Sequence, residues 1–357
     1  MRLGSYALAL RLLRELKLAR SEQKSRRDEA FRKLSRFVYE NNSFYRRLMD
    51  ENSLFPDTVK LRDFPVLDKE DLRSAKEELI SSGRVPIASF HTSGTSRRMG
   101  EIKFDAQAMA VVDAINLFNF LTGARAGTKH LFRRCRVLGV IPLSHGCHSI
   151  MQRTPFFIAK LSYMDIGSPV EEIVERFISF RPDVLHAYPS VLQQIAEFMK
   201  EEKKSPPSNL SQISSFAESL NESLKEHLEV FFAAPIVNFY ASTETLSIAK
   251  TCVCGRMHLT LPTLLDCELI DPDTREPARG NSGEMVITNL YNYCMPLIRY
   301  SLGDLLRMDY SMDCPCGWTT PVIEEIIGRS SDLIRLSDGR SLSGAASTAR
   351  PGIPFFR

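Results

Sequence analysis

Two short cysteine-rich segments have residue types and a spacing that suit metal binding. Cys252 and Cys254 form one Cys-x-Cys-Gly knuckle, Cys314 and Cys316 form a second, and His258 follows the first. Four thiolates at glycine turns suit a tetrahedral Zn²⁺ ion, and a site without an open position is structural. The pattern therefore predicts a structural zinc held by the four cysteines. His258 could replace one of them, and a set of buried free thiols is the alternative.

A polar stretch between residues 91 and 103 suits phosphate binding. Hydroxyl groups and backbone N–H groups around a glycine can surround phosphate oxygens, and Lys103 would neutralise part of their charge. The stretch is not the G-x-x-x-x-G-K-[ST] phosphate loop, so a structural turn between strands is the alternative. The residues that would surround the phosphate are Thr92, Ser93, Gly94 and Thr95.

The segment from 237 to 244 is an apolar strand that ends in polar residues. Ser242, Thr243 and Glu244 place two hydroxyl groups and a carboxylate just after the aromatic Tyr240. Ligands bind at the carboxyl ends of strands in an open α/β sheet, so this tip is well placed for a site. A helix N-cap made by Ser242 or Thr243 is the alternative, and it would not exclude a function.

The elements that must position these residues form a layered α/β pattern. Residues 1–80 have helical apolar spacing and predict amphipathic helices packed on a larger body. Residues 81–332 alternate short apolar strands with turns and helices, which predicts an α/β body. Within it, about 252–330 predicts a β-rich subdomain, and residues 333–357 form a tail that loses this periodicity.

Four shorter patterns inside the body are specific enough to compare with a structure. Residues 136–142 and 184–188 predict strands, and residues 169–180 predict a helix. Between residues 265 and 287, two apolar runs flank a polar turn and predict a hairpin.

Composition limits the class of partner. The 357 residues include 46 basic and 43 acidic side chains, a net charge of +3 that is too small to suggest a nucleic-acid partner. The apolar run at residues 6–10 is much shorter than the ~20 residues that a membrane-spanning helix needs. It is also not followed by a signal-peptide cleavage site. The eight cysteines form no regular disulfide framework, which favours the cytoplasm.

Two later segments complete an ordered set of four. Residues 295–304 end in Gly303-Asp304, and residues 327–334 contain Arg329. In this order the four segments resemble the adenylate-forming, or AMP-binding, enzyme superfamily. The Met-Pro-Leu-Ile-Arg-Tyr and Cys-Pro-Cys-Gly stretches are most similar to its phenylacetate-CoA ligase and coenzyme F390 synthetase branch. The resemblance implies a large α/β body of layered sheets with a small β-barrel-like subdomain.

The resemblance also implies an activity. In the family, ATP and a carboxylate give an acyl-adenylate and pyrophosphate, after which a thiol, usually coenzyme A, takes the acyl group. It implies ATP, Mg²⁺ and coenzyme A as cofactors and a small-molecule carboxylate, with aryl acids among the candidates, as substrate. A catalytically impaired module that binds nucleotide or acyl-adenylate is one alternative. An acyl-activating protein of surface-polysaccharide synthesis is another.

The matched positions receive roles from the resemblance. The 92–95 stretch and Lys103 would hold the phosphates, and Tyr240 would stack against adenine. Thr243 would contact the α-phosphate, and Glu244 would hold Mg²⁺, a hard cation that prefers oxygen ligands.

Further roles fall on four other matched positions. Asp304 would accept hydrogen bonds from the ribose hydroxyls, and Arg329 would bind near the same ribose and phosphate. Ala217 and Glu218 resemble the family's Gly-Glu adenine segment, with alanine in place of glycine. His145 lies in a loop similar to one near the family's acyl pocket.

Two departures from the family pattern affect the expected chemistry. Ser96-Arg97-Arg98 stands where the family has a second threonine and Gly-Lys-Pro, and the loss of that glycine would stiffen the loop. The family also has a small, mobile C-terminal domain whose lysine completes the adenylation site, whereas this sequence stops soon after Asp332. We therefore expect this lid to be absent from the chain or supplied by a separate polypeptide or a homo-oligomer.

Overall fold

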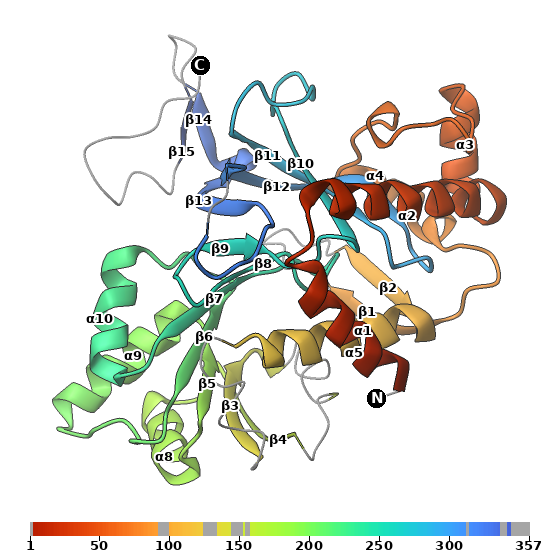
Figure 1. The fold of residues 1–357 in the computed structure, drawn as a ribbon. Helices are drawn as coiled ribbons and strands as arrows, with labels where there is room; N and C mark the ends of the chain where they lie inside the picture. The colour runs from red at the N-terminus through yellow and green to blue at the C-terminus, as the bar shows by residue number, and fades with distance from the viewer. Residues whose placement is uncertain are drawn as a thin grey trace. The chain divides into compact units, whose positions relative to one another are not determined.

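The computed structural model describes residues 3–91, 100–123, 134–143, 153, 158–311, 314–335 and 341–343 (Figure 1). The chain forms two compact units, each assembled from segments that are far apart in the sequence. Unit 1 comprises Met1–Lys17, Ala106–Thr260 and Cys314–Trp318. Unit 2 comprises Leu18–Asp105, Leu261–Asp313 and Thr319–Arg357.

Unit 1 contains a sheet whose neighbouring strands β4, β3, β5, β6 and β7 run parallel. Strands β8 and β9 continue the sheet in antiparallel pairing beyond β7. The predicted strands at 136–142 and 184–188 are confirmed as β3 and β5. The strand bounds are β3 (Cys135–Ile141), β4 (Ala159–Asp165), β5 (Val184–Ala187), β6 (Gln212–Phe216), β7 (Ile236–Tyr240), β8 (Ala249–Thr251) and β9 (Met257–Leu259).

Helices cover both faces of this sheet. Leu138 of β3 packs in a core with Phe177 of α8, whereas the adjacent Val137 packs with Phe120 of α5. Because successive strand residues point to opposite faces, α5 and the α8–α10 group lie on opposite sides of the sheet (Figure 1). The predicted helix at 169–180 is confirmed as α8. The helix bounds are α1 (Leu3–Glu15), α5 (Ala106–Leu121), α8 (Val170–Phe180), α9 (Pro189–Glu201) and α10 (Glu222–Phe232).

Unit 2 is built on an antiparallel sheet with the order β10-β11-β12-β13. The predicted hairpin between residues 265 and 287 is confirmed by the pairing of β10 with β11. Two smaller hairpins, β1 with β2 and β14 with β15, belong to the same unit. The strand bounds are β1 (Pro86–His91), β2 (Glu101–Asp105), β10 (Leu265–Ile270), β11 (Ser282–Asn289), β12 (Leu297–Asp309), β13 (Val322–Arg329), β14 (Leu333–Arg335) and β15 (Ser341–Ser343).

The N-terminal helices of unit 2 pack on this sheet through one fully buried tyrosine. Tyr45 donates a hydrogen bond from its hydroxyl to the carbonyl oxygen of Pro296 and accepts one from the N–H of Ile298. Asn42 ends one helix and caps the next by accepting a hydrogen bond from the N–H of Tyr45. The helix bounds are α2 (Arg20–Asn41), α3 (Ser43–Glu51), η1 (Leu61–Asp63), α4 (Lys69–Ala75), η2 (Lys76–Leu79) and η4 (Ser330–Asp332).

Length and polarity rule out a membrane-crossing role for each helix in the described ranges.

Candidate functional site

The carboxyl ends of β5, β6 and β7 form one edge of the unit 1 sheet because these strands are parallel neighbours. Ala217 and Glu218 follow β6, and Thr243 and Glu244 follow β7, whose last residue is Tyr240. The structure therefore brings five sequence-predicted residues to the edge where ligands bind in open α/β sheets.

Glu218 anchors the segment after β6. Its carboxylate accepts hydrogen bonds from the backbone N–H and the hydroxyl of Ser190, each at 2.9 Å. Ser190 lies in the first turn of α9, where free N–H groups and the helix dipole favour a negative charge. Ala217 has a φ of +67°, a left-handed conformation that glycine adopts without steric cost. The backbone thus keeps a glycine-like turn although the side chain is alanine.

A tight turn positions the residues after β7. The carbonyl oxygen of Ser242 accepts hydrogen bonds from the N–H groups of Thr245 and Leu246, at 3.3 and 2.7 Å. Since β8 follows this turn and no helix begins there among the described residues, the helix-cap interpretation is wrong. Glu244 is only 7% exposed, so its carboxylate lies in a fixed, largely dry place. Such a carboxylate can hold a hard cation.

Aromatic rings line the same edge, which the sequence did not indicate. The His186 ring stacks on Phe216 with centroids 4.1 Å apart and planes 7° from parallel, and Tyr188 contacts Phe216 edge-on at 4.8 Å. Burial lowers the pKa of His186 to about 4, so the imidazole is neutral at physiological pH. These rings were missed because they come from the ends of two different strands, β5 and β6, and only the strand pairing brings them together.

Unit 2 contains a second group of predicted residues. Asp304 of β12 lies opposite Arg329 of β13, and Arg329 Nε lies 2.9 Å from Asp304 Oδ1. The guanidinium also donates to the carbonyl oxygen of Leu302 at 2.8 Å. The Asp304 side chain is 13% exposed and that of Arg329 is 54% exposed. The sheet register thus fixes a carboxylate beside an accessible cation, an arrangement suited to hydroxyl and phosphate groups.

Lys103 lies on β2 of unit 2, and β1 and β2 flank residues 92–99. Its ammonium is 2.8 Å from the carboxylate of Glu77, which raises the pKa of Lys103 and keeps it charged. The predicted phosphate-binding residues Thr92, Ser93, Gly94 and Thr95, and also His145, lie outside the described residues.

The cysteine knuckles come together in unit 1. The ligand atoms of Cys252, His258, Cys314 and Cys316 all lie within 4.8 Å of one another. Two of the separations, Cys252 Sγ to Cys314 Sγ and Cys316 Sγ to His258 Nε2, are both 3.7 Å. A tetrahedral ion with Zn–S bonds of about 2.3 Å requires its ligands to be roughly 3.8 Å apart. Three sulfurs and one imidazole nitrogen therefore have the spacing and chemistry of a zinc site.

The backbone around the cluster has the turns that the sequence predicted. Gly255 and Gly317, which follow the two knuckles, have φ values of +81° and +76°. The N–H groups of Cys254 and Trp318 point at the sulfurs of Cys252 and Cys316, each at 3.4 Å. Cys254 itself is exposed and lies outside the group of four, whereas His258 is fully buried within it.

A buried lysine beside the cluster was also missed by the sequence analysis. Lys250 is fully buried, and its ammonium lies 5.5–5.9 Å from the ring centroids of Phe118, Phe239 and Trp318. It donates hydrogen bonds to the carbonyl oxygen of Asn119, at 3.3 Å, and to the Thr122 hydroxyl. Burial lowers the pKa of Lys250 to about 7. The Lys250 side chain therefore contacts α5, β7 and the segment that follows the second cysteine knuckle.

Fold and site together define an α/β protein with a ligand edge on parallel strands of unit 1 and an Asp–Arg pair on antiparallel strands of unit 2. Residues 109–292 match the AMP-binding enzyme family. Phenylacetate-coenzyme A ligase of Thermus thermophilus is 30% identical over 332 residues, covering 89% of this chain and 72% of that protein. Protein CapK of Staphylococcus aureus is 20% identical and covers 86% of this chain and 68% of CapK.

Solved structures agree on the fold. A 2-hydroxyisobutyryl-CoA ligase in complex with 2-HIB-AMP and CoA, in the thioesterification state, superposes with a TM-score of 0.77. The match has 20% identity and covers 93% of this chain and 73% of that one. The chain belongs to the AMP-binding, adenylate-forming enzyme family, as its motifs predicted. The predicted layered α/β fold is likewise confirmed.

Proposed function

We propose that this protein uses ATP to convert a small carboxylic acid into an acyl-adenylate and then transfers the acyl group to coenzyme A. Family membership supports this reaction, as do several relatives named phenylacetate-coenzyme A ligase. The observation that carries the proposal is the register of Asp304 opposite Arg329. The strand pairing brings together two positions that are 25 residues apart in the sequence, and the resemblance gives both of them roles near the ribose.

The proposed reaction has two balanced steps. A carboxylate oxygen attacks the α-phosphorus of ATP, the bond from that phosphorus to the β-phosphate oxygen breaks, and pyrophosphate leaves. The thiolate sulfur of coenzyme A then attacks the acyl carbonyl carbon, and AMP leaves with the oxygen that joined it to the acyl group. The thiol proton is released to solvent. Both steps require stabilisation of charge on phosphate oxygens.

Residues of this chain would bind and orient ATP in the first step. Asp304 accepts hydrogen bonds from the ribose hydroxyls, and Arg329 contributes positive charge near the α-phosphate. Tyr240 stacks against adenine, and Thr243 donates its hydroxyl to an α-phosphate oxygen. Glu244 would hold Mg²⁺, which when bound neutralises charge on the phosphates. Glu244 is 7% exposed, so little water would compete for its carboxylate.

The remaining predicted groups receive the other roles of the proposed reaction. Lys103 and the hydroxyl residues Thr92, Ser93 and Thr95, with Gly94, would contact the departing pyrophosphate. Ala217 and Glu218 would line the adenine side, and His145 would face the acyl group. Phenylacetate is the first acid to test because it is the substrate named for several relatives.

Phenylacetate-dependent release of pyrophosphate from ATP tests the proposal. We expect release by the wild-type chain and, in Asp304→Ala, ATP binding at least tenfold weaker, because a hydrogen bond to a charged group contributes about 1.5–3 kcal/mol. Glu276→Gln, an exposed carboxylate change in the β10–β11 connection, is the control and should behave as wild type. ATP binding without pyrophosphate release for any acid in a broad panel would favour the binding-module alternative. Equal ATP affinity in wild type and Asp304→Ala would contradict the site assignment.

We also propose a structural zinc in unit 1. The geometry favours Cys252, Cys314, Cys316 and His258 as its ligands, with Cys254 as the alternative to His258. The ion would join the segment after β8 to residues 314–318, which come from a distant part of the sequence. Metal analysis of the purified chain should return one zinc per molecule.

A further inference from the structure

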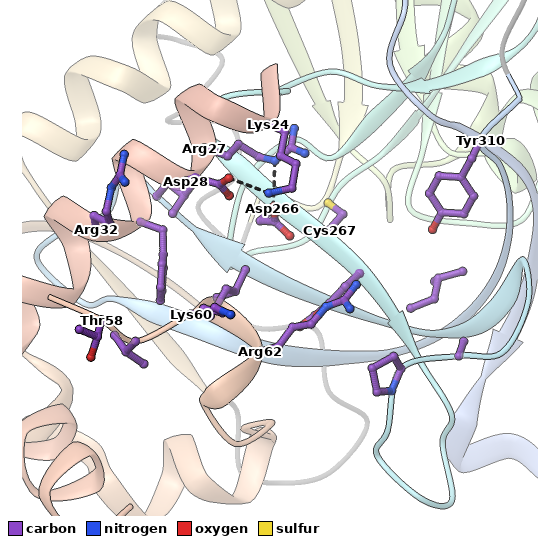
Figure 2. A pocket seen from close by; sticks show the side chains of 18 of the residues that line it. Lys24, Arg27, Asp28, Arg32, Thr58, Lys60, Arg62, Asp266, Cys267 and Tyr310 are labelled. Atoms are coloured by element: carbon purple, nitrogen blue, oxygen red, sulfur yellow. Dashed lines mark hydrogen bonds and ion pairs between the residues drawn. The ribbon is translucent and has the colours of Figure 1, made fainter. Parts of the chain in front are cut away.

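Unit 2 contains a cavity of about 920 Å³ that is not lined by Asp304, Arg329 or Lys103. Its walls come from the first half of α2, the segment at residues 57–62, and β10 with the connection that follows it (Figure 2). Small-molecule sites commonly have volumes of about 300–1,000 Å³. The cavity is therefore large enough for a ligand of nucleotide size.

The carboxylates around this cavity are already paired. Lys24 Nζ lies 2.6 Å from Asp28, and Arg27 Nε lies 2.8 Å from Asp266, which Figure 2 marks with dashed lines. The other two carboxylates also have cationic partners: Asp57 pairs with Arg36 at 2.6 Å, and Glu268 pairs with Arg299 at 2.5 Å. The negative charges of the lining are thus neutralised within the protein.

Three lining cations stand in contrast to these pairs. Arg32, Lys60 and Arg62 form no ion pair with any residue in the described ranges. All three are exposed, and Lys60 and Arg62 lie at the centre of the view in Figure 2. The lining therefore presents up to three positive charges that a ligand could neutralise.

The inner wall of the cavity is apolar. Phe31, Val59 and Leu269 are 6–8% exposed and contribute hydrocarbon surface, and Tyr310 adds a ring that is 37% exposed. Burial raises the pKa of Tyr310 and of the nearby Cys267 thiol, so both stay uncharged at neutral pH. An apolar wall beside a group of cations suits a ligand with an anionic end and an organic body.

We propose that this cavity binds an organic phosphate, with its phosphate group at Lys60 and Arg62. A guanidinium can form two parallel hydrogen bonds to phosphate oxygens, and lysine adds a point charge. A phosphate ester carries about −1.5 to −2 at pH 7, which matches several cations better than a single carboxylate does. The organic part packs against the wall formed by Phe31 and Leu269.

Two sources could supply this chemistry. One is the phosphorylated nucleotide end of coenzyme A, and this assignment rests on the proposed function. The other is a separate phosphorylated metabolite that binds independently of acyl transfer. Calorimetric titration of the full chain with coenzyme A, adenosine 3′,5′-bisphosphate and inorganic phosphate distinguishes them. Binding of coenzyme A and the bisphosphate with similar affinity indicates the first source, and binding of the bisphosphate alone indicates the second.

The double variant Lys60→Ala/Arg62→Ala tests the residues. We expect adenosine 3′,5′-bisphosphate to bind at least tenfold more weakly, with ATP affinity and thermal stability unchanged, because both side chains are exposed. The matched control Arg14→Ala/Lys17→Ala removes the same two charges from an exposed position in unit 1 and should bind as wild type. Asp304→Ala should give the opposite pattern, with weak ATP binding and unchanged bisphosphate binding. The two sites can therefore fail independently.

Three results would overturn the proposal. The first is an unchanged bisphosphate affinity in Lys60→Ala/Arg62→Ala. The second is an equal loss of ATP affinity in that variant, which would make the cavity part of the ATP site. The third is inorganic phosphate binding as tightly as the bisphosphate, which would leave no role for the apolar wall.

Discussion

The thiol cluster and the carboxyl edge of β5–β7 belong to the same unit but hold their groups in different ways. In the cluster, the ligand atoms of Cys252, Cys314, Cys316 and His258 lie within 4.8 Å of one another, and backbone N–H groups point at two of the sulfurs. At the edge, Glu218 is fixed by Ser190 of the α9 first turn. The proposed zinc would stabilise the first arrangement, whereas hydrogen bonds within the protein hold the second.

This difference predicts that damage to the cluster lowers stability, whereas damage to the edge lowers activity. The most demanding test is removal of zinc. Because the four proposed ligands meet only when the chain folds, Cys314→Ser should lose the ion and destabilise the fold by up to about 4 kcal/mol when free zinc exceeds Kd a thousandfold. Thermal unfolding with metal analysis measures both effects.

The fourth ligand is decided by two matched variants. Cys254→Ser should keep one zinc per chain because Cys254 is exposed and outside the group of four, whereas His258→Asn should lose it. The reverse pattern would restore the four-cysteine site predicted from the sequence. An unchanged melting temperature in Cys314→Ser would show that the cluster binds no stabilising metal.

The edge should respond in the opposite manner. Glu244→Gln keeps the size of a side chain that is 93% buried but removes its charge, so the melting temperature should change little. Adenylation should slow by about a hundredfold to a thousandfold. This is the usual loss of rate when one group that stabilises negative charge in the transition state is removed. Pyrophosphate release measured at saturating ATP separates this rate effect from weaker binding. If Glu244→Gln lowers the melting temperature but leaves the adenylation rate unchanged, Glu244 has a structural role and does not take part in catalysis.

Acid should destabilise the edge through His186. Its folded pKa of about 4 lies below the unfolded value of about 6.5, so the unfolded chain binds more protons between these pH values. Stability from this residue is present above pH 6.5 and falls as the pH drops toward 4, by up to about 3 kcal/mol. Urea unfolding of wild type and His186→Phe across pH 4–7 measures the difference, and parallel pH profiles would rule out this role.

The smallest expected effect concerns the turn after β6. Ala217→Gly should stabilise the chain by about 1 kcal/mol, since glycine relieves the cost of a φ of +67° but adds freedom to the unfolded chain. A melting-temperature gain without a change in ATP affinity is expected. A loss of stability would mean that the alanine methyl group makes packing contacts that outweigh the strain.

Sequence patterns predicted elements whose cause is local. The apolar runs of β3 and β5, the helix α8 and the β10–β11 hairpin follow from periodicity and turn residues, and the structure confirms them. The break between α2 and α3 at Asn42 was not predicted because no proline or glycine marks it, and the asparagine acts as a cap. Local patterns therefore predicted elements better than their ends.

Groups assembled from distant segments were harder to predict. The two cysteine knuckles could be recognised in the sequence because the spacing within each one is local. The position of His258 among the metal-ligating atoms depends instead on how β9 packs against residues 314–318. The aromatic rings around Lys250 and the His186–Phe216 stack bring together residues from separate elements. No single segment of the sequence therefore predicts them. The membership of residues 314–318 in unit 1 likewise follows from packing alone.

Oxygen transfer tests the proposed chemistry most directly. Phenylacetate labelled with ¹⁸O in both carboxylate oxygens is incubated with the chain, ATP, Mg²⁺ and coenzyme A, and the nucleotide product is analysed by mass spectrometry. Attack of the carboxylate on the α-phosphorus, followed by thiol attack on the acyl carbon, predicts AMP that carries one ¹⁸O atom. Unlabelled AMP, or ADP as the product, would contradict an acyl-adenylate intermediate.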